Sequence, residues 1–173
     1  MKPLFELRGG FDFGGKMKDR IAKASLEPLA EKTVEVISAW KYDAPYEAYS
    51  FRGQDDLYLW DRSTWGTEQF CLVEGDVLFG QVACQYEGDD LWVGWSMAPQ
   101  LCGKGNGALF VKRCVQELRC VKKHTGRILL RVAARNQRAI KAYQKAGFRY
   151  VETIQDEIAY SNHMEDFWVM ESL

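Results

Sequence analysis

The chain has 173 residues, a formal net charge of −1 and a hydrophobic content of 47%. This length predicts one domain that buries about 70% of the surface its unfolded chain would expose. The near-neutral charge excludes a general attraction to nucleic acid or to an anionic membrane surface, and no apolar run of the sequence approaches the length of a membrane span.

Five cysteines are an odd number, and none of them forms a C-x-x-C pair. This pattern favours reduced thiols over a disulfide framework or a zinc site. His124 and His163 stand alone without metal-ligand spacing, so no metal is expected. The N-terminus also lacks the apolar run of a secretion signal. These observations together predict a cytoplasmic protein.

The N-terminal residues 1–16 contain four glycines and show no sustained hydrophobic period. They predict an arm that is disordered or pairs at a sheet edge, ahead of a single domain over 17–173. A first strand is expected over 21–26. A helix should follow, with Pro28 in its first turn and its end near Trp40.

The segment 40–51 is rich in aromatic residues, and Pro45 is expected to begin a second helix within it. Residues 55–65 predict a short helix or a loop. Hydrophobic periodicity then predicts strands over 69–73, 77–86 and 91–97, a helix over 109–123, a strand over 128–134, a helix capped by Asn136 and ended by Gly147, and strands over 150–158 and 167–170.

A glycine loop connects the strand ending at Met97 to the helix after it, with Gly103, Gly105 and Gly107 in the connection. Glycines let a ligand approach the backbone closely, and the N–H groups of a first helical turn attract phosphate. Gly103, Gly105 and Ala108 satisfy the dinucleotide fingerprint G-x-G-x-x-G/A, which is a weak signal alone.

The surroundings of the loop count against dinucleotide binding. In that fingerprint the first glycine directly follows the strand, and an acidic residue ends the next strand about 20 residues on. Here five residues separate Met97 from Gly103, and the next strand is followed by Arg135 and Asn136. A nucleotide-binding domain is therefore the weakest of the alternatives considered.

Two motifs resemble the GNAT superfamily of acyl-CoA-dependent N-acetyltransferases. The first is Gln100-x-x-Gly103-x-Gly105, which is similar to the acyl-CoA loop of that family. The second is RVAARNQRAIKAYQKAGFR over 131–149, which resembles the family's following strand, an Asn, a helix with a tyrosine and a closing Gly-Phe. The resemblance implies an α/β (α+β) fold with a mixed, mostly antiparallel sheet of about six or seven strands and about four helices, in the order β-α-α-β-β-β-α-β-α-β-β.

The resemblance also implies where acetyl-CoA lies. Its pyrophosphate would rest on the amides of 102–108, and its pantetheine arm would pair with the strand before the loop. The Met97 N–H would then stabilise the oxygen that gains charge during amine attack. The residues implied in acetyl-CoA binding are Trp95, Ser96, Met97, Cys102, Gly103, Lys104, Gly105, Asn106, Gly107, Ala108, Asn136 and Tyr143.

Catalytic candidates follow from the same resemblance. Tyr143 matches the family's tyrosine and is the candidate general acid for the departing thiolate, although packing under its helix explains it too. Asp89 and Asp90 fall near the position of the family's carboxylate base, although a charged turn in solvent explains them as well. A water molecule is the alternative base.

The resemblance places the acceptor near the aromatic residues Trp40, Tyr42, Tyr46 and Tyr49, and rings with acids nearby suit a cationic amine. Core packing explains these rings equally well. We therefore expect acetyl transfer from acetyl-CoA to a primary amine of a small molecule, a peptide or a protein, by direct attack. The alternative is a non-catalytic acyl-CoA-binding or sensing module. Dimers are frequent in the family, so a homodimer is one arrangement that the resemblance allows.

Overall fold

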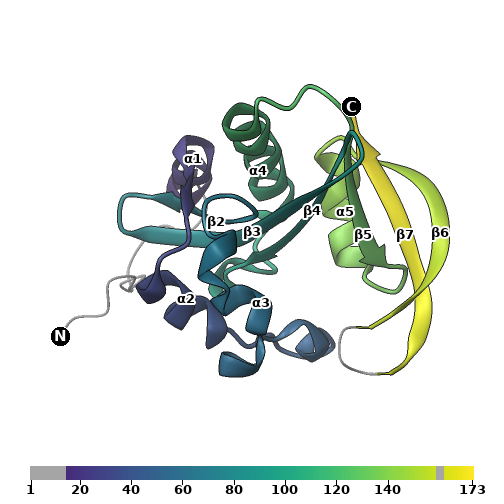
Figure 1. Ribbon diagram of the computed structural model, residues 1–173, viewed down its shortest axis with the longest axis horizontal. Helices are drawn as coiled ribbons and strands as arrows, with labels where there is room; N and C mark the ends of the chain where they lie inside the picture. Colours follow the sequence, from purple (N-terminus) through teal and green to yellow (C-terminus); the bar gives the residue numbers. More distant parts are fainter. Residues whose placement is uncertain (1–14, 159–161) are drawn as a thin grey trace.

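The computed structural model describes residues 15–158 and 162–173, which form a twisted seven-stranded sheet with helices packed against it (Figure 1). The strands are β1 (Ser25–Pro28), β2 (Gln69–Glu74), β3 (Val77–Glu87), β4 (Asp90–Met97), β5 (Ile128–Ala133), β6 (Arg149–Glu157) and β7 (Met164–Ser172). The helices are α1 (Gly15–Lys23), α2 (Glu31–Ser38), α3 (Leu57–Trp60), α4 (Gly107–Lys122) and α5 (Gln137–Lys145), with short 3₁₀ turns between them.

The strands lie in the order β1-β2-β3-β4-β5-β7-β6. Every neighbouring pair is antiparallel except β4 and β5, which are parallel. The predicted α/β class with a mostly antiparallel sheet is confirmed. A parallel pair needs a crossover connection, and α4 supplies it between β4 and β5.

Helices cover both faces of the sheet. In Figure 1, α1 and α4 lie above the strands and α2 and α3 lie below them. Phe110 of α4 packs directly over Gly80 of β3, where a Cβ atom would come within 2.4 Å of the ring. The glycine therefore lets α4 sit close to the strand, and this contact holds the helix N-terminus near the end of β4.

The N-terminal part differs from its prediction. Met17 and Ile21 are buried four residues apart on α1, so this segment is helical and the first strand begins only at Ser25. The predicted strand over 21–26 and the arm over 1–16 thus overlap α1, while residues 1–14 of that arm lie outside the described residues. Pro28 ends β1, which is an edge strand where proline is tolerated, and does not begin a helix.

The second predicted helix is also shorter than expected. Within the segment 40–51, the 3₁₀ turn η1 (Glu47–Tyr49) takes the place of this helix after Pro45. The strands and helices after residue 69 are confirmed within a few residues, with β7 longer than predicted at both ends. Asn136 caps the start of α5, and Gly147, with its positive φ, follows its end, as the sequence indicates.

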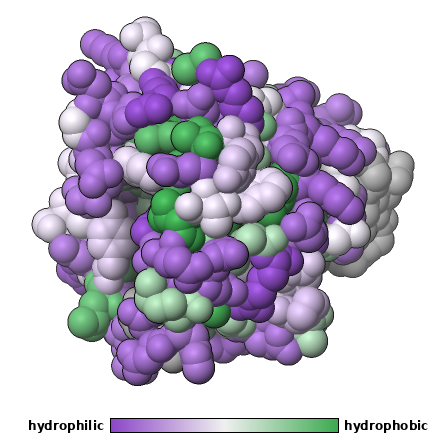
Figure 2. Space-filling view, turned by 90° about the vertical axis from the view of Figure 1, so that its right-hand side faces the viewer, coloured by the Kyte–Doolittle hydropathy of each residue, from purple (hydrophilic) through white to green (hydrophobic). Residues whose placement is uncertain are grey.

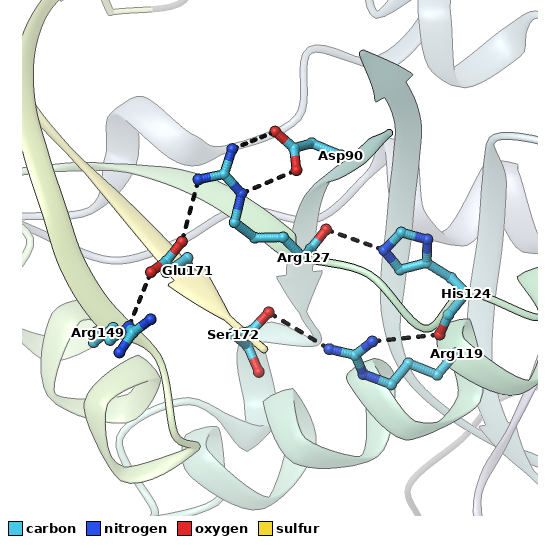
Figure 3. A network of polar contacts seen from close by, with 7 residues as sticks. All are labelled: Asp90, Arg119, His124, Arg127, Arg149, Glu171 and Ser172. Atoms are coloured by element: carbon cyan, nitrogen blue, oxygen red, sulfur yellow. Dashed lines mark hydrogen bonds and ion pairs between the residues drawn. The ribbon is translucent and has the colours of Figure 1, made fainter. Parts of the chain in front are cut away.

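The side of the molecule formed by β6 and β7 is mainly hydrophilic, with separate hydrophobic patches (Figure 2). The edge strand β6 contributes the exposed side chains of Tyr150 and Val151. Arg149 at its start forms an ion pair with Glu171 of β7 at 2.9 Å, and Glu171 in turn binds Arg127 (Figure 3).

Arg127 closes one end of the β4–β5 pair. Its guanidinium donates to both carboxylate oxygens of Asp90, at 2.9 and 2.5 Å, and also reaches Glu171 at 3.4 Å (Figure 3). The Arg127 guanidinium beside Asp90 holds the pKa of that carboxyl below its usual value. The start of β4 is therefore tied to the start of β5 and to the end of β7.

Candidate active site

The β4–β5 pair is closed at one end and parted at the other. Its ladder contains only two pairs, Leu91 with Ile128 and Trp92 with Leu129, although β4 continues to Met97. The opposite edge of β4 pairs with β3 along its whole length. We refer to the β5-facing side of residues 93–97 as the open edge of β4.

Backbone direction along β4 identifies the groups on this open edge. The Leu91 N–H donates to the Arg127 carbonyl on the β5 side, whereas the Ala98 N–H donates to the Phe79 carbonyl on the β3 side. Backbone polar groups alternate sides along a strand. The N–H and C=O groups of Val93 and Trp95 and the N–H of Met97 therefore face the open edge, and they leave a row that an extended chain can pair with.

The glycine loop follows the open edge. Gly103 and Gly105 have φ angles of +71° and +75°, and a Cβ atom built on either would meet no atom within 4 Å. These positions need glycine for their backbone conformation, and open space lies beside them.

Helix α4 begins directly after the loop. Its first backbone bond runs from the Phe110 N–H to the Asn106 carbonyl. The N–H groups of Gly107, Ala108 and Leu109 therefore precede the helix's own hydrogen bonds and are directed past its N-terminus. This arrangement fits a phosphate, because the helix dipole places positive charge at the same point.

The side chains of Asn106 and Cys102, two residues predicted to bind acetyl-CoA, contact the backbone of the loop. Asn106 is buried, and its side-chain amide donates to the Leu101 carbonyl at 3.1 Å, so this side chain braces the turn from inside. The Cys102 thiol lies 3.8 Å from the Met97 carbonyl and 3.7 Å from the Ala98 carbonyl, and burial raises its pKa. The Asn106 side-chain oxygen is buried and has no partner within the described residues.

Helix α5 brings Tyr143 to the open edge. The ring centroids of Tyr143, Trp95 and Phe148 lie 6.1 Å apart in each pair. Burial raises the pKa of Tyr143 to about 12, so its hydroxyl stays protonated. Asn136 begins α5, and its side chain accepts from the Ala139 N–H at 3.2 Å.

The aromatic segment after α2 crosses the end of β4. The Tyr42 hydroxyl donates to the Met97 carbonyl at 2.7 Å, and burial raises the pKa of Tyr42. The guanidinium of Arg138 stacks over the Tyr46 ring at 3.7 Å from its centroid. Trp40 differs from these tyrosines, because it is buried against Phe51, which agrees with the alternative of core packing. Its place at the acceptor stays a prediction.

Asp89 and Asp90 lie at the opposite end of β4 from the loop. Asp90 and Trp95 lie five positions apart, which corresponds to about 17 Å of extended strand. Asp90 is also bound to Arg127. This placement does not support either aspartate as the general base, and that role stays a prediction.

Sequence reasoning missed one residue beside the site, Glu165, whereas it placed Tyr49 in the aromatic cluster expected at the acceptor. Arg135, which follows β5, donates to one oxygen of Glu165 at 2.7 Å. The sequence gives no motif for Glu165, because it lies 116 positions from Tyr49 and only the fold brings the two together. Within residues 15–158 and 162–173, no three His, Cys, Asp or Glu side chains gather as metal ligands. None of the described helices is both long enough and apolar enough to cross a membrane.

A model of the acetyltransferase (GNAT) family matches residues 34–148, which is more than half of the chain and includes both motifs. The chain belongs to the GNAT family. It is thus an N-acetyltransferase by family, and the family match lends no support to dinucleotide binding at the glycine loop.

Several solved structures share the fold at low sequence identity. A GNAT acetyltransferase from Bacillus anthracis is 18% identical, with a TM-score of 0.67 over 86% of this chain and 93% of that one. Spermidine N-acetyltransferase from Vibrio cholerae in complex with CoA and spermine is 21% identical, with a TM-score of 0.63 over 88% of this GNAT chain and 96% of that one. At this level of identity, the structural similarity shows a shared fold only.

Proposed function

We propose that this GNAT enzyme moves the acetyl group of acetyl-CoA to a primary amine by direct attack, without a covalent enzyme intermediate. The parting of β4 and β5 beside the glycine loop supports the proposal most strongly. It leaves a row of strand N–H and C=O groups next to a helix N-terminus, which suits a molecule with an extended amide arm and a diphosphate.

The residues present fit acetyl-CoA, which would supply the activated acetyl group as co-substrate. The amides of 102–108 would hold its diphosphate, and Gly103 and Gly105 leave room for it. The backbone of Trp95 and Met97 would pair with the amide arm. The side-chain oxygen of Asn136 caps α5, and its amide nitrogen would donate to the same arm.

Two groups would act on the charges that develop during transfer. The Met97 N–H faces the open edge and would donate to the carbonyl oxygen of the acetyl group as negative charge builds there. Tyr42 bonds the Met97 carbonyl and so fixes the orientation of this peptide. The Tyr143 hydroxyl would donate to the departing thiolate.

The attacking amine must lose a proton, since an alkylammonium has a reference pKa of about 10.4. Asp89 and Asp90 are remote from Tyr143, so we assign this proton to water. The rate should then rise with pH until the amine itself is deprotonated.

The test combines binding with turnover. In thermal denaturation, CoA at 100 times its dissociation constant should stabilise the protein by about 2.7 kcal/mol, and NAD and ATP should not. Release of free CoA should then be followed with a panel of primary amines, peptides and protein N-termini. Stabilisation by NAD or ATP without stabilisation by CoA would refute the proposal, and CoA binding without turnover on any amine would favour the non-catalytic module.

A further inference from the structure

Three side-chain oxygens are shielded from solvent and have no hydrogen-bond partner among the residues that the structure describes. One is Asn106 Oδ1 in the glycine loop, and the other two are the Tyr49 hydroxyl, on η1, and Glu165 Oε1, near the start of β7. Glu165 Oε2 accepts from Arg135 Nε at 2.7 Å, so only one half of this carboxylate is used. Polar atoms removed from water are normally paired, and an exception calls for an explanation.

Glu171 on the same strand has a hydrogen-bond partner for each of its carboxylate oxygens. It lies six positions after Glu165, so the two side chains leave the same face of β7. One oxygen of Glu171 binds Arg127 and the other binds Arg149 (Figure 3). Glu165 has one cationic partner, Arg135, and within the described residues it has no second one for its other oxygen.

The position of Glu165 and Tyr49 links them to the proposed reaction. Arg135 stands between the end of β5 and Asn136, at the parted end of the β4–β5 pair. Burial raises the pKa of Tyr49 and the charge of Glu165 raises it further, whereas the charge of Arg135 and a contact with the Asn136 side chain lower it. The pKa of Tyr143 is raised mainly by burial and also by Tyr49, so Tyr49 lies within electrostatic reach of both Glu165 and Tyr143.

Glu165 Oε1 and the Tyr49 hydroxyl suit a ligand that donates hydrogen bonds. A carboxylate oxygen only accepts hydrogen bonds, and a phenolic oxygen can accept one as well. A protonated amine donates several hydrogen bonds and carries the charge that Glu165 attracts. Such an amine cannot be the nucleophile, because a carboxylate partner favours its protonated form.

We propose that Glu165 Oε1 and Tyr49 Oη bind a second, protonated nitrogen of the acceptor, so that the enzyme prefers diamines and polyamines to monoamines. This inference rests on the proposed acetyl transfer and adds the substrate class to it. Glu165 and Tyr49 act as specificity residues and take no part in the bond changes at the acetyl group.

The experiment compares 1,4-diaminobutane with n-butylamine, which has the same chain and one nitrogen. With acetyl-CoA saturating, kcat/KM is measured for the unmodified enzyme, Glu165→Gln, Tyr49→Phe and the control Glu152→Gln. Glu152 is an exposed carboxylate on β6, so its variant removes the same charge away from the site.

Glu165→Gln should lower kcat/KM for 1,4-diaminobutane by about 10- to 100-fold, since it removes a hydrogen bond to a charged group, and should change n-butylamine by less than about threefold. Tyr49→Phe keeps every charge and should lower the diamine value by about three- to tenfold. Glu152→Gln should leave the ratio between the two amines unchanged.

Equal losses with both amines, or no loss with either, would overturn the inference. Transfer by the unmodified enzyme to both amines at the same rate would overturn it too, while leaving the proposed function intact. No transfer to any amine would count against the proposed function instead. CoA affinity and Tm report folding of each variant, and Tyr49→Phe alone carries the test if Glu165→Gln does not fold.

Discussion

Replacing Tyr143 by Phe tests the role of its hydroxyl, because the change removes one oxygen and keeps the ring. The ring contacts with Trp95 and Phe148 remain possible for Phe, so the fold should be preserved. Burial raises the pKa of Tyr143 to about 12. A thiol has a reference pKa of about 8.5, so complete proton transfer from Tyr143 to the thiolate would be uphill by about 5 kcal/mol.

Tyr143 should therefore act as a hydrogen-bond donor that stabilises the thiolate, with the final proton coming from solvent. A hydrogen bond to a charged group contributes about 1.5–3 kcal/mol, which corresponds to about 10- to 150-fold in rate. We expect Tyr143→Phe to lower kcat by that factor and to leave the KM for acetyl-CoA nearly unchanged. Steady-state release of free CoA with a saturating amine measures both quantities.

The pH profile gives a second readout. The raised pKa keeps Tyr143 protonated, so the unmodified enzyme should show no loss of activity from its ionisation at about pH 6 to 9. Tyr150→Phe is the matched control, because its hydroxyl lies on exposed β6 and contacts Thr153. A loss of kcat below about threefold in Tyr143→Phe, or a loss confined to the KM for acetyl-CoA, would refute the assigned role.

Two further changes test the loop and the closed end of the β4–β5 pair. Gly105→Ala places a side chain on a residue with a φ of +75°, which introduces a strain of about 1–2 kcal/mol. This variant should weaken CoA binding, measured by calorimetry, about tenfold. The control Gly88→Ala, at a φ of +62° in a distant turn, should lower the stability by a similar amount and leave the CoA affinity unchanged. Equal effects of both on CoA would contradict a ligand role for the loop. Arg127→Met should lower Tm at pH 7, because it removes the ion pair with Asp90. The difference in Tm between the variant and the unmodified protein should become smaller as the pH falls through the lowered pKa of Asp90, because that carboxyl then loses its charge in both proteins. A gap that stays constant down to that pH would show that the ion pair does not stabilise the fold.

Local patterns were sufficient for most of the elements after residue 69. Alternating apolar residues in β2 to β4, the helical stripe of α4, and the Asn136 cap and Gly147 stop of α5 each carry their signal within a few residues. The N-terminal region was predicted less well. There the helical pair Met17 and Ile21 stood next to a glycine-rich segment, and Pro28 suited both a helix start and an edge strand.

In the candidate site, too, some residues could be predicted from local sequence motifs and others could not. The glycine loop and Tyr143 were found because their motifs are contiguous in sequence. The contact between Asp90 and Arg127 could not be predicted, because the two residues lie 37 positions apart and only strand pairing brings them together at the far end of β4. The burial of Trp40 likewise depends on packing with residues distant in the chain.

The sequence alone determined that a strand enters a helix through a glycine turn and that the next helix carries an asparagine cap and a tyrosine, because backbone conformation and capping depend on neighbouring residues. Only the tertiary structure decided that β4 and β5 part after two pairs, which aims the Met97 N–H at the open edge. It also brought Tyr49 and Glu165 beside Asn136 and left an oxygen of each unpaired. Such juxtapositions arise from packing between segments far apart in the chain, and no local pattern encodes them.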